Sequence, residues 1–174
     1  SDLSRKKMKK LIVILGLTLT LSFGATYEEG VAAFKKNDYK TAKKIFEDLA
    51  SKNNIKAQYA LGTMYDNGNG VKQDYFKAKE WYEKAAENGY APAQFNLGSI
   101  YSNGQGTKQD YIKAKKWYEK AAYNGNIPAQ YNLGLMYVKG QGVKQNFEIA
   151  KHWFVKACGG GLKEGCQSYK ELNQ

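Results

Sequence analysis

The side chains best suited to covalent chemistry are two cysteines, Cys158 and Cys166, which lie close together near the C-terminus. Thiol pairs in proteins form structural disulfides, remain reduced, or act as redox couples. Redox couples of the thioredoxin type use a Cys-x-x-Cys motif, whereas seven residues separate this pair, so the spacing excludes that chemistry. A disulfide and two free thiols therefore remain as alternatives.

The chain carries few of the groups that hydrolases use. His152 is the single histidine, whereas a zinc hydrolase site needs several imidazole ligands. The Ser-x-x-Lys motif of serine β-lactamases occurs once, from Ser4 to Lys7, and its companions Ser-Asp-Asn and Lys-Thr-Gly are missing. We predict no catalytic residues, no metal site and no cofactor, and we expect His152 on the surface.

Glycine pairs of the form Gly-x-Gly, which hold phosphate in some proteins, recur at three places that are 36 residues apart. A phosphate-binding loop of that kind also needs a Lys-Ser/Thr pair and the start of a helix, and both are missing here. We interpret the pairs as turns that need a positive φ angle. They are Gly68 with Gly70, Gly104 with Gly106, and Gly140 with Gly142.

These glycines belong to a repeat with a period of 36 residues. The segment that starts at Ala57 returns at Ala93 and Ala129, each time as Ala-Gln-aromatic-x-Leu-Gly. A fixed period of this length is typical of stacked supersecondary units. Because Ala57, Leu61 and Tyr65 recur at helical spacing, each unit should contain helices, and the chain should be all-α.

Two helices are expected in each unit. A glycine in the middle of the first helix is unfavourable, so its recurrence indicates an approach too close for a Cβ atom. The second helix should begin after an Asp or Asn that accepts N–H groups of the first turn. Its tryptophans are expected in the core. The glycines are Gly62, Gly98 and Gly134, the caps Asp74, Asp110 and Asn146, and the tryptophans Trp81, Trp117 and Trp153.

The N-terminus has the features of a secretory signal peptide. Basic residues around Met8, the expected start, precede an apolar run from Leu11 to Leu21 and then small residues. The run is short for a membrane span, which needs about 20 residues, although an uncleaved anchor is the alternative. We expect cleavage after Gly24, export to the periplasm or out of the cell, and no stable membrane span in the mature chain.

The mature chain is basic, because without residues 1–24 it keeps 22 lysines and 15 acidic residues, a net charge of +7. A lysine-coated soluble surface explains this charge, and attraction to an acidic cell-wall polymer or anionic surface is the alternative. We expect no nucleic-acid partner, because no basic arm or basic stripe with interleaved aromatic residues is present.

The motifs Ala-x-x-x-Leu-Gly-x-x-Tyr and Ala-x-x-Trp-Tyr-x-x-Ala-Ala, with the Gly-x-Gly turn between them, resemble the Sel-one-like repeat, a relative of the tetratricopeptide repeat. The resemblance covers residues 57–158 and implies a right-handed superhelical solenoid of antiparallel helix pairs. The segment from Tyr27 to Ala50 is more similar to a tetratricopeptide unit, because its turn is four residues shorter. The predicted parts are a leader (1–24), an N-terminal helix pair (25–54), repeats at 55–90, 91–126 and 127–162, and a capping helix (163–174).

The resemblance also implies a concave groove, lined by the first helices, that binds a protein or peptide. By analogy with tetratricopeptide units, each repeat offers an aromatic residue and a smaller residue one turn later, and two asparagines match those that hold a peptide backbone or carboxylate. Packing between neighbouring helices is the alternative role for the aromatics. The candidates are Tyr59, Thr63, Phe95, Asn96, Ser99, Tyr131, Asn132, Leu135 and Lys139.

The repeat assigns a place to the cysteines as well. Cys158 is in register with Ala122 at the end of a second helix, and Cys166 with Gln130 near the start of the next helix. The two should face each other across a helix–turn–helix, which favours a disulfide in an exported protein. This placement resembles the Helicobacter cysteine-rich proteins, exported Sel-one-like repeat proteins of which some are described as penicillin-binding or as β-lactamases.

We therefore predict a monomeric, non-catalytic scaffold for a protein or peptide partner. A protein that binds or hydrolyses β-lactams or cell-wall peptides is the alternative that rests on the resemblance, and a module for cell-wall polymer is the one that rests on charge.

Overall fold

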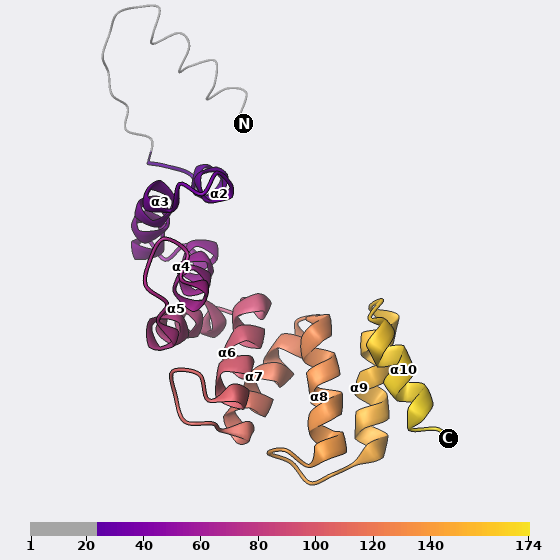
Figure 1. The fold of residues 1–174 in the computed structure, drawn as a ribbon. Helices are drawn as coiled ribbons and strands as arrows, with labels where there is room; N and C mark the ends of the chain where they lie inside the picture. Colours follow the sequence, from indigo (N-terminus) through magenta and orange to yellow (C-terminus); the bar gives the residue numbers. More distant parts are fainter. Residues whose placement is uncertain (1–23) are drawn as a thin grey trace, which may run out of the picture.

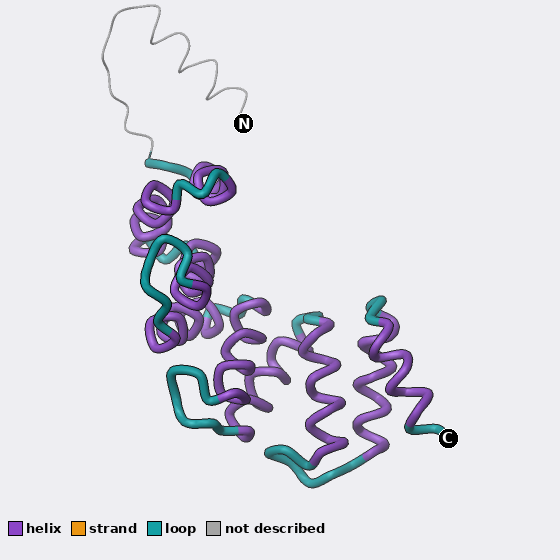
Figure 2. Tube along the Cα trace, in the orientation of Figure 1, coloured by secondary structure: helices purple, strands orange, loops and turns teal. Residues whose placement is uncertain are grey.

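The computed structural model describes residues 24–174, in which helices pack as sequential pairs along a bent path (Figure 1). Figure 2 shows that the described residues contain helices and loops and no strand. The expected all-α solenoid is thereby confirmed. The helices are α2 (Tyr27–Lys35), α3 (Tyr39–Ser51), α4 (Ile55–Asn67), α5 (Tyr75–Glu87), α6 (Ala91–Asn103), α7 (Tyr111–Tyr123), α8 (Ile127–Lys139), α9 (Phe147–Gly159) and α10 (Lys163–Glu171).

Polar side chains determine where the second helices begin. Asp74, Asp110 and Asn146 each accept a hydrogen bond from the backbone N–H three residues later, at 3.0, 2.9 and 3.0 Å. Asn54 and Asn126 do the same for α4 and α8. Each bond satisfies an N–H group that has no partner inside its helix, so the predicted caps are confirmed.

The Gly-x-Gly turns end the first helices and also join neighbouring repeats. Their glycines have φ angles between 64° and 71°, as the turns require. A Cβ atom on Gly106 would lie 2.6 Å from the carbonyl carbon of Tyr75, and one on Gly142 would lie 2.6 Å from that of Tyr111. The second glycine of each turn therefore lets the loop rest on the start of the preceding repeat's second helix.

In each helix pair, a glycine of the first helix packs directly against an aromatic ring of the second helix. A Cβ atom on Gly62 would lie 2.5 Å from the ring of Tyr82, and one on Gly98 would lie 2.6 Å from the ring of Tyr118. In α2, a Cβ atom on Gly30 would meet the ring of its partner helix in the same way, at 2.5 Å. The expected close approach is confirmed, and the N-terminal pair uses it too.

The tryptophans differ from one another in burial. Trp153 is buried with 5% of its surface exposed, whereas Trp81 and Trp117 are half-buried and pack against the edge of the core. The next residue in each repeat, such as Tyr82, takes the position against the glycine and is more deeply buried. The expectation of a core position is therefore fully met for Trp153 alone.

The predicted signal peptide falls on residues 1–24 and, apart from Gly24, lies outside the described residues. Among the helices of residues 24–174, none combines the length and the apolar character needed to cross a membrane.

We expect Gly98→Ala to lower the free energy of unfolding by about 1–3 kcal/mol, the usual cost of an overpacked core. The added methyl group would press on the buried ring of Tyr118 and outweigh the better helix propensity of alanine. The matched control is Gly159→Ala, because a Cβ atom there meets nothing within 4 Å. Thermal melts followed by circular dichroism check both variants. Equal melting temperatures for Gly98→Ala and the unaltered protein would contradict the close-contact explanation.

Candidate partner-binding site

The candidate residues lie on the first helices of the three repeats, at equivalent positions. Tyr59 is on α4, Phe95 on α6 and Tyr131 on α8, and all three are half-buried. Leu135 is half-buried too, whereas Lys139 is exposed at the end of α8. The side chains thus retain accessible surface on one face, which we call the first-helix face.

The aromatic residues of this face also pack inside their own repeats. The ring centroids of Tyr59 and Tyr82 are 5.6 Å apart, and those of Phe95 and Tyr118 are 5.8 Å apart. In the third repeat the ring centroids of Tyr131 and Phe154 are 5.5 Å apart. Part of each ring therefore supports the helix pair, as the packing alternative expects, and the rest faces outward.

Hydroxyl groups of the second helices contact the first helices of their own repeats. The Tyr82 hydroxyl donates to the Asp66 carboxylate at 3.1 Å and lies 3.4 Å from the Thr63 hydroxyl oxygen. The distance between the Ser99 and Tyr118 hydroxyl oxygens is 3.1 Å. Burial raises the pKa of Tyr82 far above its usual range and raises the pKa of Tyr118 as well, so both tyrosines stay protonated at neutral pH. The predicted Asn96 and Asn132 are half-buried on the same helices as Phe95 and Tyr131.

A pocket of about 170 Å³ extends the first-helix face toward the N-terminus. It lies between α2 and α4 above one residue of α3, and its lining is mainly apolar. The sequence prediction did not include the contribution of α2, although its side chains follow one another at helical spacing. The lining residues are Tyr27, Val31, Phe34, Phe46, Tyr59, Ala60 and Thr63.

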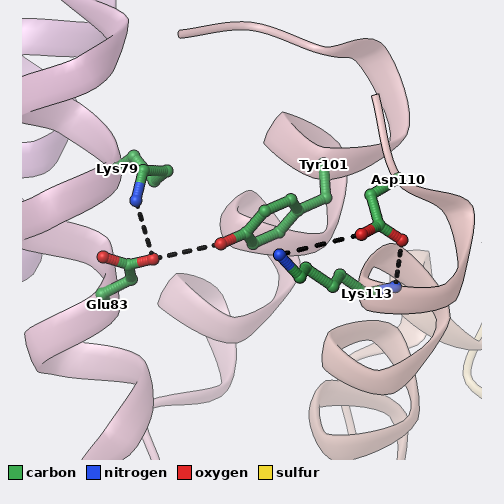
Figure 3. Close-up of polar contacts among 5 residues, drawn as sticks. All are labelled: Lys79, Glu83, Tyr101, Asp110 and Lys113. Carbon is green, nitrogen blue, oxygen red and sulfur yellow. Dashed lines mark hydrogen bonds and ion pairs between the residues drawn. The ribbon is translucent and has the colours of Figure 1, made fainter. Parts of the chain in front are cut away.

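A polar cluster between neighbouring repeats, shown in Figure 3, shares no residue with the lining of this pocket. Lys79 and Glu83 of α5 form an ion pair at 2.9 Å, and the Tyr101 hydroxyl donates to Glu83 at 3.2 Å. The Lys113 ammonium lies 5.3 Å from the Tyr101 ring centroid and 3.8 Å from Asp110. Burial raises the pKa of Tyr101, and the Glu83 carboxylate raises it further. Each charged side chain of the cluster has a partner. The hydrogen bond between Tyr101 of α6 and Glu83 of α5 joins one repeat to the preceding one.

The cysteines form a disulfide at the C-terminal end of the solenoid. The Cα atoms of Cys158 and Cys166 are 4.6 Å apart, and the bond joins α9 to α10. At the two preceding pair boundaries the position of Cys166 is a glutamine that donates to a carbonyl at the position of Cys158. Gln94 donates to the Ala86 carbonyl at 3.0 Å in this way. The disulfide thus replaces a recurring hydrogen bond with a covalent link.

Residues 24–174 contain no group of three or more His, Cys, Asp or Glu residues that could hold a metal ion. His152 is exposed, as expected, and its ring lies edge-on to Trp153 at 5.5 Å.

Comparison with known proteins places the repeats in a family. The Sel1 repeat model matches residues 55–90, 91–126 and 127–162. Two solved structures are similar over most of the chain. The Sel1 repeat protein from Oxalobacter formigenes is 33% identical over 83% of this chain, with a TM-score of 0.79. The second, c5321, a protective antigen present in uropathogenic Escherichia coli strains, is 31% identical over 82% of this chain, with a TM-score of 0.72. Helicobacter pylori cysteine rich protein B is similar at 25% identity over 83% of the chain, with a TM-score of 0.56.

The three solved structures differ in length relative to this chain. The chain spans 59% of the Oxalobacter formigenes protein, 35% of c5321 and 97% of cysteine rich protein B. No match is found among curated protein sequences.

We predict that Cys158 and Cys166 are bonded in protein recovered from an oxidising compartment. Reduction should then raise the intact mass by two hydrogen atoms, and both thiols should become alkylated only after reduction. Mass spectrometry before and after reductant measures both effects. Alkylation of two thiols without reductant would contradict the prediction.

Proposed function

Because the chain belongs to the Sel1 repeat family, we propose that it is an exported scaffold that binds a protein or peptide through the first-helix face of α4, α6 and α8. The partner contacts assigned to this face are Tyr59, Phe95, Asn96, Ser99, Tyr131, Asn132, Leu135 and Lys139.

The pocket between α2 and α4 is the observation that carries this proposal. It offers a largely apolar surface that is continuous with Tyr59 and Thr63, the first members of the predicted series. Ligand sites in proteins are commonly concave and apolar, with a few polar groups that fix orientation. An apolar side chain of an extended or helical partner segment fits a pocket of this kind.

The polar groups of the face supply the orienting contacts. Asn96 and Asn132 are half-buried, and an asparagine amide can both donate and accept hydrogen bonds. In this proposal these donors and acceptors bind the backbone of the partner. Lys139, exposed at the end of α8, attracts an acidic group at one end of the bound segment.

Export is part of the proposal. The N-terminal sequence has the pattern of a signal peptide, and a disulfide is stable in an oxidising compartment. The protein acts there as a monomer, without catalysis of its own.

We expect Asn132→Ala to weaken binding of the partner about tenfold, because hydrogen bonds to the partner's backbone are lost. The melting temperature should change little, since substitutions at half-exposed positions usually stay within about 0.5 kcal/mol. The partner is first recovered from an envelope extract by pull-down, and titration calorimetry then measures its affinity for each variant.

Two controls separate binding from folding. Tyr118→Phe removes a buried hydroxyl whose oxygen lies 3.1 Å from that of Ser99 inside the fold, and it should leave affinity unchanged. Phe154→Ala empties a position that is 1% exposed and should cost about 3–5 kcal/mol of stability. If Asn132→Ala melts as early as Phe154→Ala, the asparagine is structural, and if it melts and binds normally, the partner binds elsewhere.

We also expect no hydrolysis of a chromogenic β-lactam above a control without protein. The nucleophile motif Ser4–Lys7 lies in the predicted leader, and the helices of residues 24–174 hold no metal-binding group of His, Cys, Asp and Glu. The measurement is absorbance over time with purified protein. Turnover that is abolished by a single point substitution would favour the hydrolase alternative.

A further inference from the structure

Positive charge is distributed unevenly along the solenoid. Residues 24–106 contain eleven lysines and ten acidic residues, whereas residues 107–174 contain eleven lysines and five acidic residues. The net charge is therefore +1 in the first segment and +6 in the second. A partner that is attracted by charge should approach the C-terminal half.

Large apolar side chains are exposed in the same half. Ile112 and Tyr123, near the two ends of α7, have 71% and 74% of their surface exposed. Single exposed apolar residues are common, but these two lie on one helix and flank two lysines. Lys116, Lys120 and Tyr123 follow Ile112 by four, eight and eleven residues, which places all four side chains on one side of the helix.

The neighbouring helix α9 extends this surface. The ring of Tyr123 lies 5.7 Å from that of Trp153, and the ammonium of Lys156 lies 5.1 Å from the Trp153 ring centroid. Lys120 lies over Trp117 in the same way, at 4.3 Å. We call the surface formed by Ile112, Lys116, Lys120, Tyr123 and Lys156 the outer patch.

The corresponding surface of the preceding repeat differs in charge. On α5 the equivalents of Ile112, Lys116, Lys120 and Tyr123 are Phe76, Glu80, Lys84 and Glu87, so two acidic residues interrupt the stripe. The combination of exposed apolar residues with uninterrupted positive charge is therefore a property of α7 and not of the repeat in general.

We propose that the outer patch binds the surface of an anionic phospholipid bilayer. The side chains of Ile112 and Tyr123 project from the protein, so they suit a deformable apolar layer better than a rigid pocket on a partner. The lysines between them match anionic head groups, and amphipathic tyrosine is favoured at the membrane interface. A hydrophilic cell-wall polymer would leave the apolar side chains without a partner, and a second copy of the chain would bring the same +6 charge against itself.

Binding to vesicles tests this proposal, with protein purified as it accumulates in the expression host and its N-terminus determined by mass spectrometry. Vesicles of equimolar phosphatidylglycerol and phosphatidylcholine should sediment the protein, and vesicles of phosphatidylcholine alone should sediment much less. Added salt should weaken the binding, because it screens exposed charges. The phosphatidylcholine vesicles also report any contribution of the N-terminal apolar run, which all variants share.

Two double variants examine the two components of the outer patch. Lys116→Gln with Lys120→Gln should lower the partition coefficient about 25-fold, since each lysine near an anionic surface contributes a factor of about five. Ile112→Ser with Tyr123→Ser should lower it about tenfold, because apolar burial is lost. The matched controls are Phe76→Ser and Lys84→Gln on α5, which should leave it unchanged. Thermal melts establish that all variants are folded.

Several results would overturn the proposal. One is the absence of binding to the anionic vesicles, and another is an equal loss with the α5 controls. Binding that depends on the lysines but not on Ile112 and Tyr123 would indicate a charged polymer. If the double variants lose an acidic protein partner and the unaltered protein does not bind vesicles, the outer patch is a protein interface.

Discussion

The solenoid depends on one contact, an aromatic ring that lies directly against a glycine of the facing helix. Gly62, Gly98 and Gly134 face Tyr82, Tyr118 and Phe154, and Gly30 faces Phe46 in the N-terminal pair. The ring lies twenty residues after the glycine in each repeat, but sixteen residues after it in the N-terminal pair. The difference lies entirely in the turn, so the contact is conserved between pairs whose connections differ in length. Helix spacing is thus set by the side chains that interlock, and the loop adapts to it.

The same contact links fold and candidate function. The ring that covers the glycine also supports the aromatic residue of the first-helix face, such as Tyr59 on Tyr82. Its hydroxyl contacts the first helix of the same repeat, as the Tyr82 hydroxyl does when it donates to Asp66 at 3.1 Å. A partner bound to this face would therefore contact side chains whose positions are already fixed by packing, which lowers the entropy lost on binding. Substitutions at the face consequently have to be compared with substitutions in the core before they are interpreted.

Sequence reasoning predicted the features that arise within one helix pair. Caps such as Asp74, turns such as Gly68 and the approach at Gly62 depend on local backbone geometry, and each has a recognisable residue type at a fixed place. Features that depend on how one pair meets the next were not predicted. The contribution of α2 to the pocket and the cluster around Tyr101 require the angle between pairs, which no single repeat specifies. Half-burial of Trp117 has the same origin, because burial at the edge of a pair depends on its neighbour.

The boundary between α9 and α10 departs from the other pair boundaries. Lys43–Glu47, Lys79–Glu83 and Lys115–Glu119 are ion pairs, and the Tyr101 hydroxyl of the next repeat donates to Glu83. In α9 the equivalent positions are Lys151 and Val155, and Lys151 pairs with Glu148 instead. The residue in register with Tyr101 and Tyr137 is Asn173, so a carboxylate at position 155 would have no tyrosine hydroxyl to accept from. Helix α10 instead attaches to α9 through the disulfide. The covalent bond therefore occurs at the pair boundary where both the carboxylate and the tyrosine of the repeat are replaced.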